Sequence, residues 1–519
     1  MLAHSSPHQT RLQAGIRSCL LDQPARVVLR DGEHSITGGE LIEKADRLAG
    51  GLDLAIGDRV AFLAPNTIEA VAVVLACYLH GLIAVPLNYR FTAAEAGHVI
   101  QKVRPSVLIG DGDRQEVLEE IVAEFPDLDT VGIGWDADLS FEELLLAEPA
   151  DPEGVSEDAL ALILMTSGST GEPKGVVHTH QTVWEGAHSA KEAYGYSEKD
   201  VLLVSKPISH AGGLQTQLFG GIFGKAHIVL SMRPKPSDAV TLIQKHKVTV
   251  SALLASDFLD FIEYLEDTGT HLPTVNRFVA SGDAVPHDLH ERFAKIFGFD
   301  PTEGCGISEV AAYFTMNPMD GTNRRGSIGI PTPRFKVRIV DDEGKDVPQG
   351  ETGEIVVQSK AVTPGYWEDP ERTQELFRDG WMLTGDLGHK DEDGFFWFKC
   401  RKKLLIVRRG SNISPIEVED HLDEHPKVHA SVVVGVKDRR DGEVPVAFIA
   451  PLDPEDIPTT EELTRFAAEQ LASYKIPVRF LFRSELPRTA TGKFDRNELH
   501  EEAVVAYVDA VSSDKNNRD

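Results

Sequence analysis

The sequence predicts an α/β protein with a large layered N-terminal domain and a small α+β domain at the C-terminal end. Its 519 residues exceed what one hydrophobic core normally covers. Apolar strand-like runs alternate with amphipathic segments over roughly the first 400 residues. After Arg334 the pattern changes to short β-type runs. We therefore expect a large domain over residues 1–402, with a β-rich subregion at about 334–400, and a small domain over residues 403–519.

The alternation in the first part indicates β-α units. Residues 57–86 read as an apolar strand, a Pro-Asn turn, an apolar helix and a second strand, which predicts a β-α-β unit. Residues 250–267 and 276–298 each begin with a β-rich run and continue as an amphipathic helix. A layered body with helices packed on sheets follows from this order.

The later part predicts smaller elements. Residues 335–344, 353–359 and 394–399 are short β runs separated by Asp-Glu-Gly turns, typical of an antiparallel or barrel-like subregion. Helical segments at 413–426 and 459–474 flank a strand-like run at 430–436. These segments form the expected α+β domain.

Composition excludes some classes of function. Apolar residues make up 41% and charged residues 26% of the chain, which is ordinary globular composition. The formal net charge of −30 argues against a nucleic-acid partner or an anionic membrane surface, because both require a basic face. It does not exclude a small polyanion held by a few local cations, backbone N–H groups and Mg2+.

Cysteine usage and hydropathy favour a cytoplasmic protein. Cys19, Cys77, Cys305 and Cys400 show neither metal-ligand spacing nor the density of a disulfide framework. The N-terminal residues lack a signal-peptide pattern, and no run approaches the roughly 18 apolar residues of a membrane span. The sequence does not determine the oligomeric state and leaves a homodimer open.

Residues 166–175, TSGSTGEPKG, form the strongest motif. Three glycines among hydroxyl residues let the backbone turn tightly, so that N–H groups and hydroxyls converge on phosphate oxygens while Lys174 supplies charge. The glycine spacing differs from that of the GxxxxGK[ST] phosphate loop, and no Ser or Thr follows the lysine. A flexible surface loop is the alternative for a generic Gly/Ser stretch. The complete string favours an anion-binding loop.

With this loop, residues 57–493 resemble the adenylate-forming superfamily of acyl-CoA synthetases, aryl-CoA ligases, firefly luciferase and nonribosomal-peptide adenylation domains. Further motifs occur in the family's order: Ser281-Gly282, EGCGISE ending at Glu309, GSIGIP, GETGEIVV, GYW, WMLTGD ending at Asp386, the Arg401 segment, and PRTATGK ending at Lys493. The resemblance implies the fold of acyl-CoA synthetases, with a small mobile C-terminal domain.

The resemblance assigns the chemistry to a few residues. Glu309 would bind the Mg2+ that neutralises the ATP phosphates, and Ser308 would lie beside the α-phosphate. Lys493 would bridge the substrate carboxylate and the α-phosphate during adenylation. His210 would lie near the reacting carboxyl group, with a packed core histidine as the alternative. Outside these motifs, a Ser-Glu pair is ordinarily a turn or a helix cap, and a lysine near the C-terminal end is ordinarily a solvated surface residue.

Nucleotide contacts follow from the same motifs. Asp386 would accept hydrogen bonds from the ribose hydroxyls, and Arg401 would donate to ribose or phosphate. The residues that the resemblance places around ATP or AMP are Thr166, Ser167, Gly168, Ser169, Thr170, Gly171, Lys174, Gly282, Asp283, Glu303, Gly304, Cys305, Gly306, Asp386 and Arg401. Cys305 departs from the family, where an aromatic ring commonly stacks on adenine, so weaker ATP binding is expected.

The acyl pocket is predicted from the family's substrate-contacting segments. Its expected residues are His210, Ala211, Gly212, Gly213, Asp257, Ala280, Ala311 and Ala312. Relatives that activate amino acids place Asp at position 211, and alanine cannot pair with an α-ammonium. The small residues, together with Phe and Tyr nearby, indicate a roomy apolar pocket for an acid that is not an α-amino acid.

The second half-reaction is expected to use a different orientation of the small C-terminal domain. Lys403 matches the hinge about which the small domain rotates. Arg408, Arg409 and Gly410 match the pantetheine and CoA side, although a surface charge run explains the two arginines equally well. The resemblance thus implies ATP- and Mg2+-dependent formation of an acyl-adenylate, domain rotation about Lys403, and transfer of the acyl group to coenzyme A.

Three alternatives remain open. Cys305, Cys400 and Leu404 depart from nucleotide or hinge motifs, so the chain could adenylate weakly and act mainly on acyl-adenylate from a partner enzyme. The acyl acceptor could be a separate carrier protein in place of CoA. A non-catalytic nucleotide-binding protein is the third alternative. The acid itself is not readable from the sequence.

Overall fold

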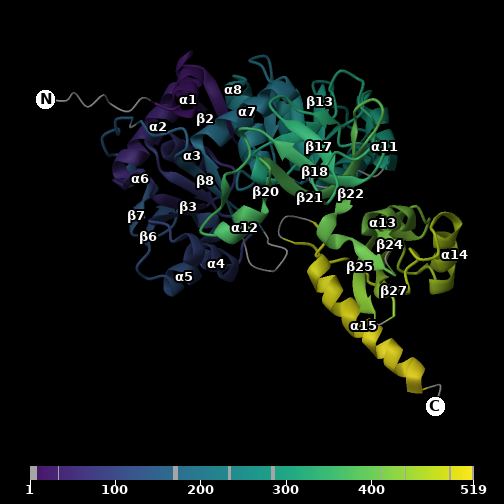
Figure 1. The fold of residues 1–519 in the computed structure, drawn as a ribbon. Coiled ribbons are helices and arrows are strands. Elements are labelled where there is room, and N and C mark those ends of the chain that lie inside the picture. Colours follow the sequence, from purple (N-terminus) through teal and green to yellow (C-terminus); the bar gives the residue numbers. More distant parts are fainter. Residues whose placement is uncertain are drawn as a thin grey trace. The chain divides into compact units, whose positions relative to one another are not determined.

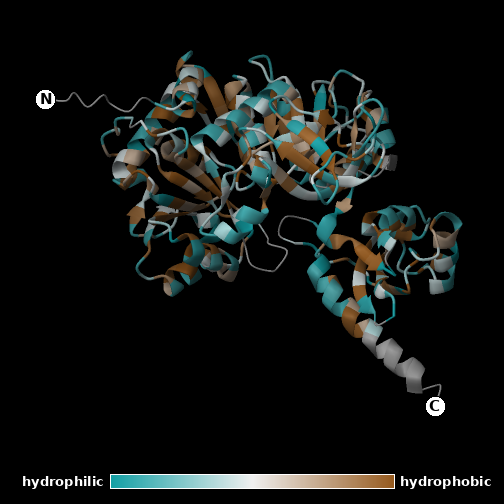
Figure 2. Ribbon diagram, viewed as in Figure 1, coloured by the Kyte–Doolittle hydropathy of each residue, from teal (hydrophilic) through white to brown (hydrophobic). Residues whose placement is uncertain are grey.

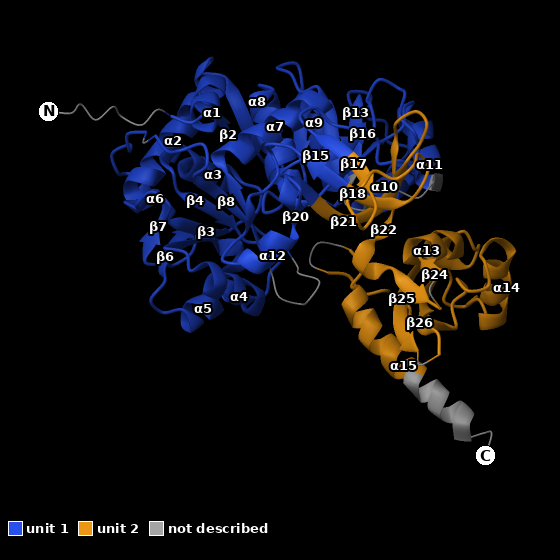
Figure 3. Ribbon diagram, in the orientation of Figure 1, with its two compact units in different colours: residues 1–337, 356–382 blue, residues 338–355, 383–519 orange. Residues whose placement is uncertain are grey.

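The structure, a computed structural model, describes residues 9–32, 34–152, 154–166, 174–231, 235–281, 287–409, 411–438, 440–489 and 493–516. The chain divides into two compact units (Figures 1 and 3). Unit 1 comprises residues 1–337 and 356–382, and unit 2 comprises residues 338–355 and 383–519.

The first large sheet of unit 1 has nine strands. In spatial order they are β16 (Ile330–Pro331), β15 (Tyr313–Met316), β14 (Thr302–Gly306), β13 (Arg277–Ser281), β12 (Val250–Leu254), β10 (Val201–Val204), β11 (His227–Leu230), β1 (Val27–Asp31) and β2 (His34–Thr37). The strands from β14 to β1 are mutually parallel, and β15, β16 and β2 are antiparallel additions at the edges. After β10 the chain continues to β11 on one side and then to β12 on the other, so the strand order reverses at β10.

The second large sheet has eight strands. In spatial order they are β19 (Gly365–Tyr366), β9 (Lys174–Thr179), β8 (Leu160–Thr166), β4 (Ile83–Pro86), β3 (Arg59–Leu63), β5 (Val107–Asp111), β6 (Asp129–Ile133) and β7 (Leu139–Ser140). Strands β8 and β9 are antiparallel, and their closing pair is Thr166 and Lys174. The ten-residue glycine motif therefore connects two neighbouring strands.

Fifteen helical segments accompany these sheets within the described part of unit 1, and thirteen of them precede residue 300. They are α1 (Arg11–Leu21), α2 (Gly38–Leu52), α3 (Ile68–His80), α4 (Ala93–Val103), η1 (Gly112–Arg114), α5 (Gln115–Glu124), α6 (Phe141–Leu144), α7 (His180–Tyr194), η2 (Gly212–Phe219), α8 (Gly220–Phe223), α9 (Pro236–His246), α10 (Ala255–Thr268) and α11 (His287–Phe297). The short helices η3 (Ser308–Val310) and α12 (Pro370–Glu375) follow later in the chain.

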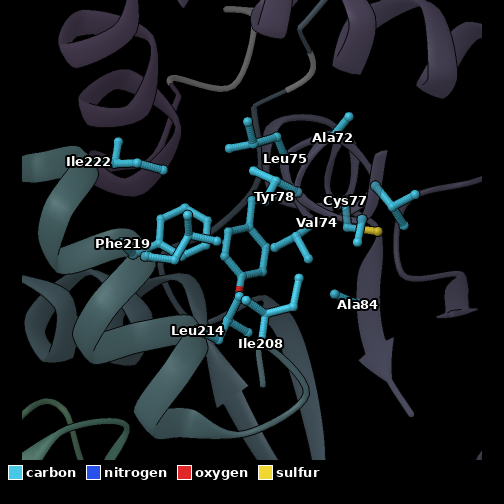
Figure 4. Close-up of a cluster of buried hydrophobic side chains, with 14 of the residues drawn as sticks. Ala72, Val74, Leu75, Cys77, Tyr78, Ala84, Ile208, Leu214, Phe219 and Ile222 are labelled. Atoms are coloured by element: carbon cyan, nitrogen blue, oxygen red, sulfur yellow. The ribbon is translucent and has the colours of Figure 1, made fainter. Parts of the chain in front are cut away.

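Helix α3 shows how the sequence specifies one of these elements. The Thr67 side chain caps its first turn by accepting from the Ala70 N–H, and Gly81, at φ 74°, ends it in the left-handed region. Apart from Glu69, its residues are buried, which explains why the segment is apolar on every side. In Figure 4 the Tyr78 ring lies beside Phe219, and its hydroxyl oxygen is directed toward Leu214 and Ile208. The helix thereby supports the chain that follows β10.

The β-rich subregion forms a five-stranded sheet, and the division between the units passes through it. Its strands are β17 (Lys336–Val340), β18 (Gly353–Gln358), β21 (Trp381–Lys390) and β20 (Phe377–Arg378), with β22 (Phe396–Arg401) paired to β21. Strand β21 alternates buried and partly exposed residues, as expected for a sheet with one covered face.

The C-terminal part of unit 2 has its own sheet and core. The strands are β24 (Ser411–Ile413), β23 (Ile406–Arg408), β26 (Gly442–Pro451) and β25 (Val428–Asp438), with β27 (Arg479–Phe482) paired to β26. Its helical segments are η4 (Lys402–Leu404), α13 (Pro415–Asp423), α14 (Thr460–Gln470) and α15 (Arg496–Asn516). Hydrophobic residues follow the strands of this sheet and of the large sheets (Figure 2).

The predicted fold class is confirmed. The expected β-α-β unit is β3-α3-β4 with parallel strands, and the two later β-α segments are β12-α10 and β13-α11. The boundary at residue 403 stays a prediction, since the compact unit that contains the C-terminal end also includes residues 338–355 and 383–402. This division reflects which residues pack together and does not test which residues rotate about Lys403. Within the described residues, no helix has the length and apolarity to cross a membrane.

Candidate active site

The parallel strands of the nine-stranded sheet place most of the predicted substrate segments beyond the same ends of the strands. Strands β10, β12, β13 and β14 are consecutive neighbours with the same direction, so their carboxyl ends lie side by side. The segments containing His210, Asp257 and Glu309 follow β10, β12 and β14. In open α/β sheets, ligands bind beyond the carboxyl ends of the strands where the order reverses, which here is at β10.

Glu309 is held by two contacts in unit 1. It lies in η3, directly after β14, and its carbonyl accepts a hydrogen bond from the Thr363 N–H at 2.7 Å. The Tyr366 hydroxyl donates to Glu309 Oε1 at 2.9 Å. A carboxylate has about four lone-pair sites, so one such contact orients the group and leaves it able to bind a hard cation.

Ser308 is positioned by a buried histidine. His178 lies in β9, and its Nε2 is 2.8 Å from the Ser308 carbonyl oxygen. Burial lowers the pKa of His178 to about 4, so the imidazole is neutral near pH 7. Because a carbonyl accepts, the proton resides on Nε2. The strand that leaves the glycine loop therefore fixes the backbone that carries Ser308 and Glu309.

Lys174 lies close to the same tyrosine. Its Nζ is 5.1 Å from the centroid of the Tyr366 ring, a cation–π distance. Strand β19 places Tyr366 there by pairing with β9 opposite Val176. Lys174 and Glu309 are 135 positions apart in the sequence, and both contact the side chain of Tyr366. The loop residues Ser167, Gly168, Ser169, Thr170 and Gly171 lie outside the described residues, whereas Thr166 is the last residue of β8.

Tyr366 had a signal in the sequence, because it lies within the GYW motif, but that motif received no role from sequence reasoning alone. Burial and the neighbouring Glu309 carboxylate raise the pKa of Tyr366, so its hydroxyl stays protonated and can donate.

Replacing Tyr366 by phenylalanine should raise the Mg2+ concentration needed for half-maximal adenylation by about tenfold, as is typical when an outer contact of a metal ligand is lost. The ring, and with it the Lys174 contact, is retained in this variant. A titration of MgCl2 at saturating ATP measures the effect. An unchanged Mg2+ requirement would show that the hydrogen bond does not prepare Glu309 for metal binding.

The segment expected along the nucleotide is a tight antiparallel pair. Gly304, Cys305 and Gly306 oppose Met316, Thr315 and Tyr313 across β14 and β15. A Cβ on Gly304 or Gly306 would lie 2.9 Å or 2.5 Å from a carbonyl oxygen of β15 or its preceding residue, which explains both glycines. Cys305 between them is partly exposed.

Glu303, at the start of this segment, points toward the protein. Its Oε2 lies 3.0 Å from His290 Nε2 and accepts from the Gly326 N–H at 3.3 Å. The expectation that its backbone follows the nucleotide is compatible with that arrangement and stays a prediction. Gly282 and Asp283 lie outside the described residues.

The predicted acyl-pocket residues fall into exposed and buried groups. His210, Ala211, Gly212 and Asp257 are partly exposed. Gly213, Ala280, Ala311 and Ala312 are buried. The chain after Ala211 forms a π-helix, η2, which the sequence did not predict. Such turns occur frequently at functional sites. Gly213 is required where this helix begins, because a Cβ there would lie 2.2 Å from the Pro207 carbonyl oxygen.

In unit 2, Asp386 and Arg401 form a pair. They are directly opposite in β21 and β22, and Arg401 Nε lies 2.9 Å from Asp386 Oδ1. Asp386 is 1% exposed as a side chain, whereas Arg401 is 36% exposed. Cys400, which departs from the family motif, is buried on the covered face of β22.

The predicted hinge follows β22 directly. Lys403 is exposed in η4, and the preceding Lys402 is tied to Asp342 at 2.8 Å and to Glu354 at 3.0 Å. The contact with Asp342 raises the pKa of Lys402. Lys402, next to the predicted hinge residue, is thus tied to two carboxylates, a contact that the sequence did not predict.

Arg408 and Arg409 share one acidic partner. Arg408 Nε lies 2.9 Å from Asp441 Oδ2, and Arg409 Nη2 lies 2.7 Å from Asp441 Oδ1. Hydrogen bonds from Arg408 and Arg409 lower the pKa of Asp441. Arg409 adopts φ 50°, a strained value for a non-glycine residue. Gly410 lies outside the described residues, and a CoA contact for all three positions stays a prediction.

Lys493 is exposed and directly precedes Phe494, which forms an isolated antiparallel bridge with Arg488. The Lys493 carbonyl accepts from the Thr489 N–H at 2.8 Å, and the guanidinium of Arg488 lies 4.3 Å from the ring centroid of Phe494. Three residues later, Arg496 Nη1 and Nη2 each lie 2.6 Å from a Glu419 carboxylate oxygen. This bidentate pair joins the start of α15 to helix α13.

Breaking that pair should misplace Lys493. Glu419→Gln retains the shape but loses the charge, and we expect adenylation to fall about tenfold, because small displacements of a catalytic group reduce rates strongly. Thioester formation from supplied acyl-adenylate should change little. Rates of the two half-reactions measure the split, and equal losses in both would indicate a general effect on the unit. Glu424→Gln, an exposed position just after α13, is the matched control.

Comparison with known proteins identifies the family of the chain. The family model described as AMP-binding enzyme matches residues 18–367, and that described as AMP-binding enzyme C-terminal domain matches residues 417–493. The indoleacetate–CoA ligase of Aromatoleum aromaticum is 31% identical over 498 residues, covering 92% of this chain and 95% of the relative. A long-chain-fatty-acid–CoA ligase of Bacillus subtilis is 31% identical over 543 residues, covering 96% of each.

A solved structure gives the same result for the fold. The crystal structure of an anthranilate CoA ligase in complex with anthranoyl-AMP superposes with a TM-score of 0.88 at 27% identity, covering 98% of this chain and 100% of the other. Fold and matches together define an adenylate-forming enzyme. The chain belongs to the AMP-binding enzyme family and, within it, to the AMP-forming acid–thiol ligases.

Proposed function

We propose that this enzyme converts a bulky, largely apolar carboxylic acid, other than an α-amino acid, into its CoA thioester through an acyl-adenylate. Enzymes of this family use ATP and CoA as co-substrates. The observation that supports the proposal most is the convergence of Lys174 and Glu309 on Tyr366. It joins the end of the predicted phosphate loop to the predicted metal ligand.

In the first half-reaction, a carboxylate oxygen of the acid attacks the α-phosphorus of ATP, and pyrophosphate leaves. Lys174 supplies positive charge beside the phosphates, and Lys493 stabilises the charge that develops on the α-phosphate and the attacking carboxylate. Glu309 would hold Mg2+, which supplies charge neutralisation to the phosphates. The neutral His178 keeps the Ser308–Glu309 backbone in place.

In the second half-reaction, the CoA thiol sulfur attacks the acyl carbon of the mixed anhydride, its proton is released, and AMP leaves. We assign Lys403 as the hinge that withdraws Lys493 and presents Arg408, Arg409 and Gly410 to CoA. The contact of Lys402 with Glu354 would anchor the chain on one side of this hinge.

The pocket residues support the choice of acid. Alanine occupies position 211, where relatives that activate amino acids place Asp, so this position provides no carboxylate for an α-ammonium. The relatives named above act on indoleacetate, anthranilate and long-chain fatty acids, so all three kinds belong in a substrate panel.

The direct test uses the purified enzyme with ATP, MgCl2, CoA and a panel of aryl, aryl-alkyl, alicyclic and fatty acids. Mass spectrometry should detect AMP and an acyl-CoA for at least one member. Supplying a synthetic acyl-adenylate and CoA without ATP separates the second half-reaction. Product there, combined with no AMP from any free acid, would replace the proposal by a thioester-forming enzyme that depends on a partner for adenylation.

A phosphopantetheinylated carrier protein is the second acceptor in the same assay. Faster acyl transfer to the carrier than to CoA would change the assigned acceptor and leave the adenylation step intact. Binding of ATP without turnover of any acid, and without thioester formation from acyl-adenylate, would indicate a non-catalytic nucleotide-binding protein.

A further inference from the structure

An arginine of unit 2 adopts an unfavourable backbone conformation. Strands β23 and β24 pair as far as Arg408 and Ser411, so Arg409 is the first residue of their two-residue connection. Its φ is 50°, in the left-handed region that Gly, Asn or Asp normally occupies in such turns. Residues held in this way concentrate at functional sites, and they persist only where surrounding contacts compensate for the strain.

The compensating contacts come from Asp441, in the turn between β25 and β26. The Arg409 N–H donates to the Asp441 carbonyl at 2.7 Å, and Arg409 Nε donates to Asp441 Oδ1 at 2.7 Å. The other carboxylate oxygen, Oδ2, accepts from Arg408 Nε at 2.9 Å. One aspartate therefore holds both the backbone and the side chain of Arg409.

The three side chains differ in their exposure to solvent. The side chains of Arg408 and Asp441 are 19% and 10% exposed, whereas that of Arg409 is 72% exposed. Arg408 also donates from Nη1 to the Tyr474 carbonyl at 2.9 Å, a second contact within the same unit. Arg409 is therefore the member of the group that a ligand can reach while the other two hold it in place.

Asp441 is itself held by its neighbours. Its backbone N–H donates to Asp438 Oδ1 at 2.7 Å, and the Tyr507 hydroxyl of α15 donates to Asp438 Oδ2 at 2.9 Å. The next residue, Gly442, pairs with Arg408 across β26 and β23. The Asp441 carboxylate thus starts from a fixed backbone, which is what a group that orients a binding residue requires.

A guanidinium group in a fixed orientation is suited to phosphate, because its planar N–H groups match phosphate oxygens two at a time. CoA carries phosphate groups at its nucleotide end, whereas the pantetheine arm that bears the thiol is uncharged. Two arginines share one aspartate here, so the group of Arg408, Arg409 and Asp441 keeps a net positive charge. The carboxylate therefore orients Arg409 without cancelling its attraction for an anion.

We propose that Asp441 is a positioning residue of the thioester-forming step and that it presents the Arg409 guanidinium to a phosphate group of CoA. This inference rests on the proposed function, in which Arg408 and Arg409 lie on the CoA side. Through this contact, Arg409 recognises the nucleotide end of CoA and not its pantetheine arm.

Thioester formation from a supplied acyl-adenylate tests the proposal, with CoA or pantetheine as the varied acceptor. Asp441→Asn keeps the shape of the side chain but loses the charge that orients Arg409. The KM for CoA should rise by about tenfold, the effect typical of losing a hydrogen bond to a charged group. Adenylation, followed by pyrophosphate release, should stay close to the wild-type rate, and so should any transfer to pantetheine, which has no phosphate.

Arg409→Gly removes the guanidinium and places at φ 50° the residue that best tolerates it, so the turn is retained. This variant should raise the KM for CoA at least as much as Asp441→Asn. Combining the two changes should add little, because contacting residues that act through one another are not additive. The matched control is Asp456→Asn, which removes an exposed carboxylate paired with Lys427 in the same unit and should keep the wild-type KM for CoA.

The outcomes separate this inference from the proposed function. An unchanged KM for CoA in Asp441→Asn, or full additivity with Arg409→Gly, overturns the positioning role and leaves the ligase function standing. Wild-type enzyme that uses pantetheine as well as CoA overturns the phosphate contact. Equal losses in adenylation and thioester formation by Asp441→Asn indicate a general effect on the unit and also overturn the positioning role. Absence of acyl-CoA from the wild type, with free acids and with acyl-adenylate, overturns the proposed function and this inference with it.

Discussion

Replacing Lys493 by alanine should reduce acyl-adenylate formation by at least about 100-fold, the effect typical of losing one group that stabilises developing charge. Lys493 is exposed, so its removal should cost the fold little. The second half-reaction should stay within a few-fold of wild type, because the lysine is assigned to the first step. Pyrophosphate release from ATP and acyl-CoA formation from supplied acyl-adenylate measure the two steps separately.

The matched control is Lys437→Ala, which removes an exposed lysine from β25 of the same unit. It should leave both half-reactions at wild-type rates. If Lys493→Ala lowers both half-reactions equally, the lysine has no special part in adenylation. If it lowers neither, PRTATGK resembles the family motif without its chemistry.

Replacing Glu309 by glutamine should lower the adenylation rate by about 100-fold and raise the MgCl2 concentration needed for activity, since the amide keeps the shape but loses the charge that a hard cation requires. The Tyr366 hydroxyl can still donate to the amide oxygen, so the local fold is retained. Rates measured over a range of MgCl2 concentrations at fixed ATP report both effects.

Glu375→Gln, at the exposed end of α12, provides the comparison and should behave as wild type. Adding Tyr366→Phe to Glu309→Gln should cause little further loss, because contacting residues that act through one another are not additive. A glutamine variant with an unchanged Mg2+ dependence would remove Glu309 from the metal site. Full additivity of the two changes would place Tyr366 in a separate role.

The helices and strands were predictable where the signal is local. The order of apolar runs and amphipathic segments, and the Pro-Asn turn within residues 57–86, act within a few residues of themselves. These features predicted β3-α3-β4, β12-α10 and β13-α11, and the ordered motifs predicted the family. The π-helix η2 was not predictable in this way, since its extra residue per turn leaves no comparable periodic signal.

The site residues also divide into those that local motifs predict and those that only the tertiary structure reveals. The sequence by itself determined the adenylate-forming class, and it predicts Lys174, Glu309, Asp386 and Lys493 as site residues because these residue types occur at fixed places in the family's motifs. The tertiary structure alone decided which residues meet: Tyr366 joins Glu309 to Lys174, Glu419 anchors Arg496, and Asp441 holds Arg408 and Arg409. Such pairs depend on strand order and register, which long-range packing sets and no local pattern records.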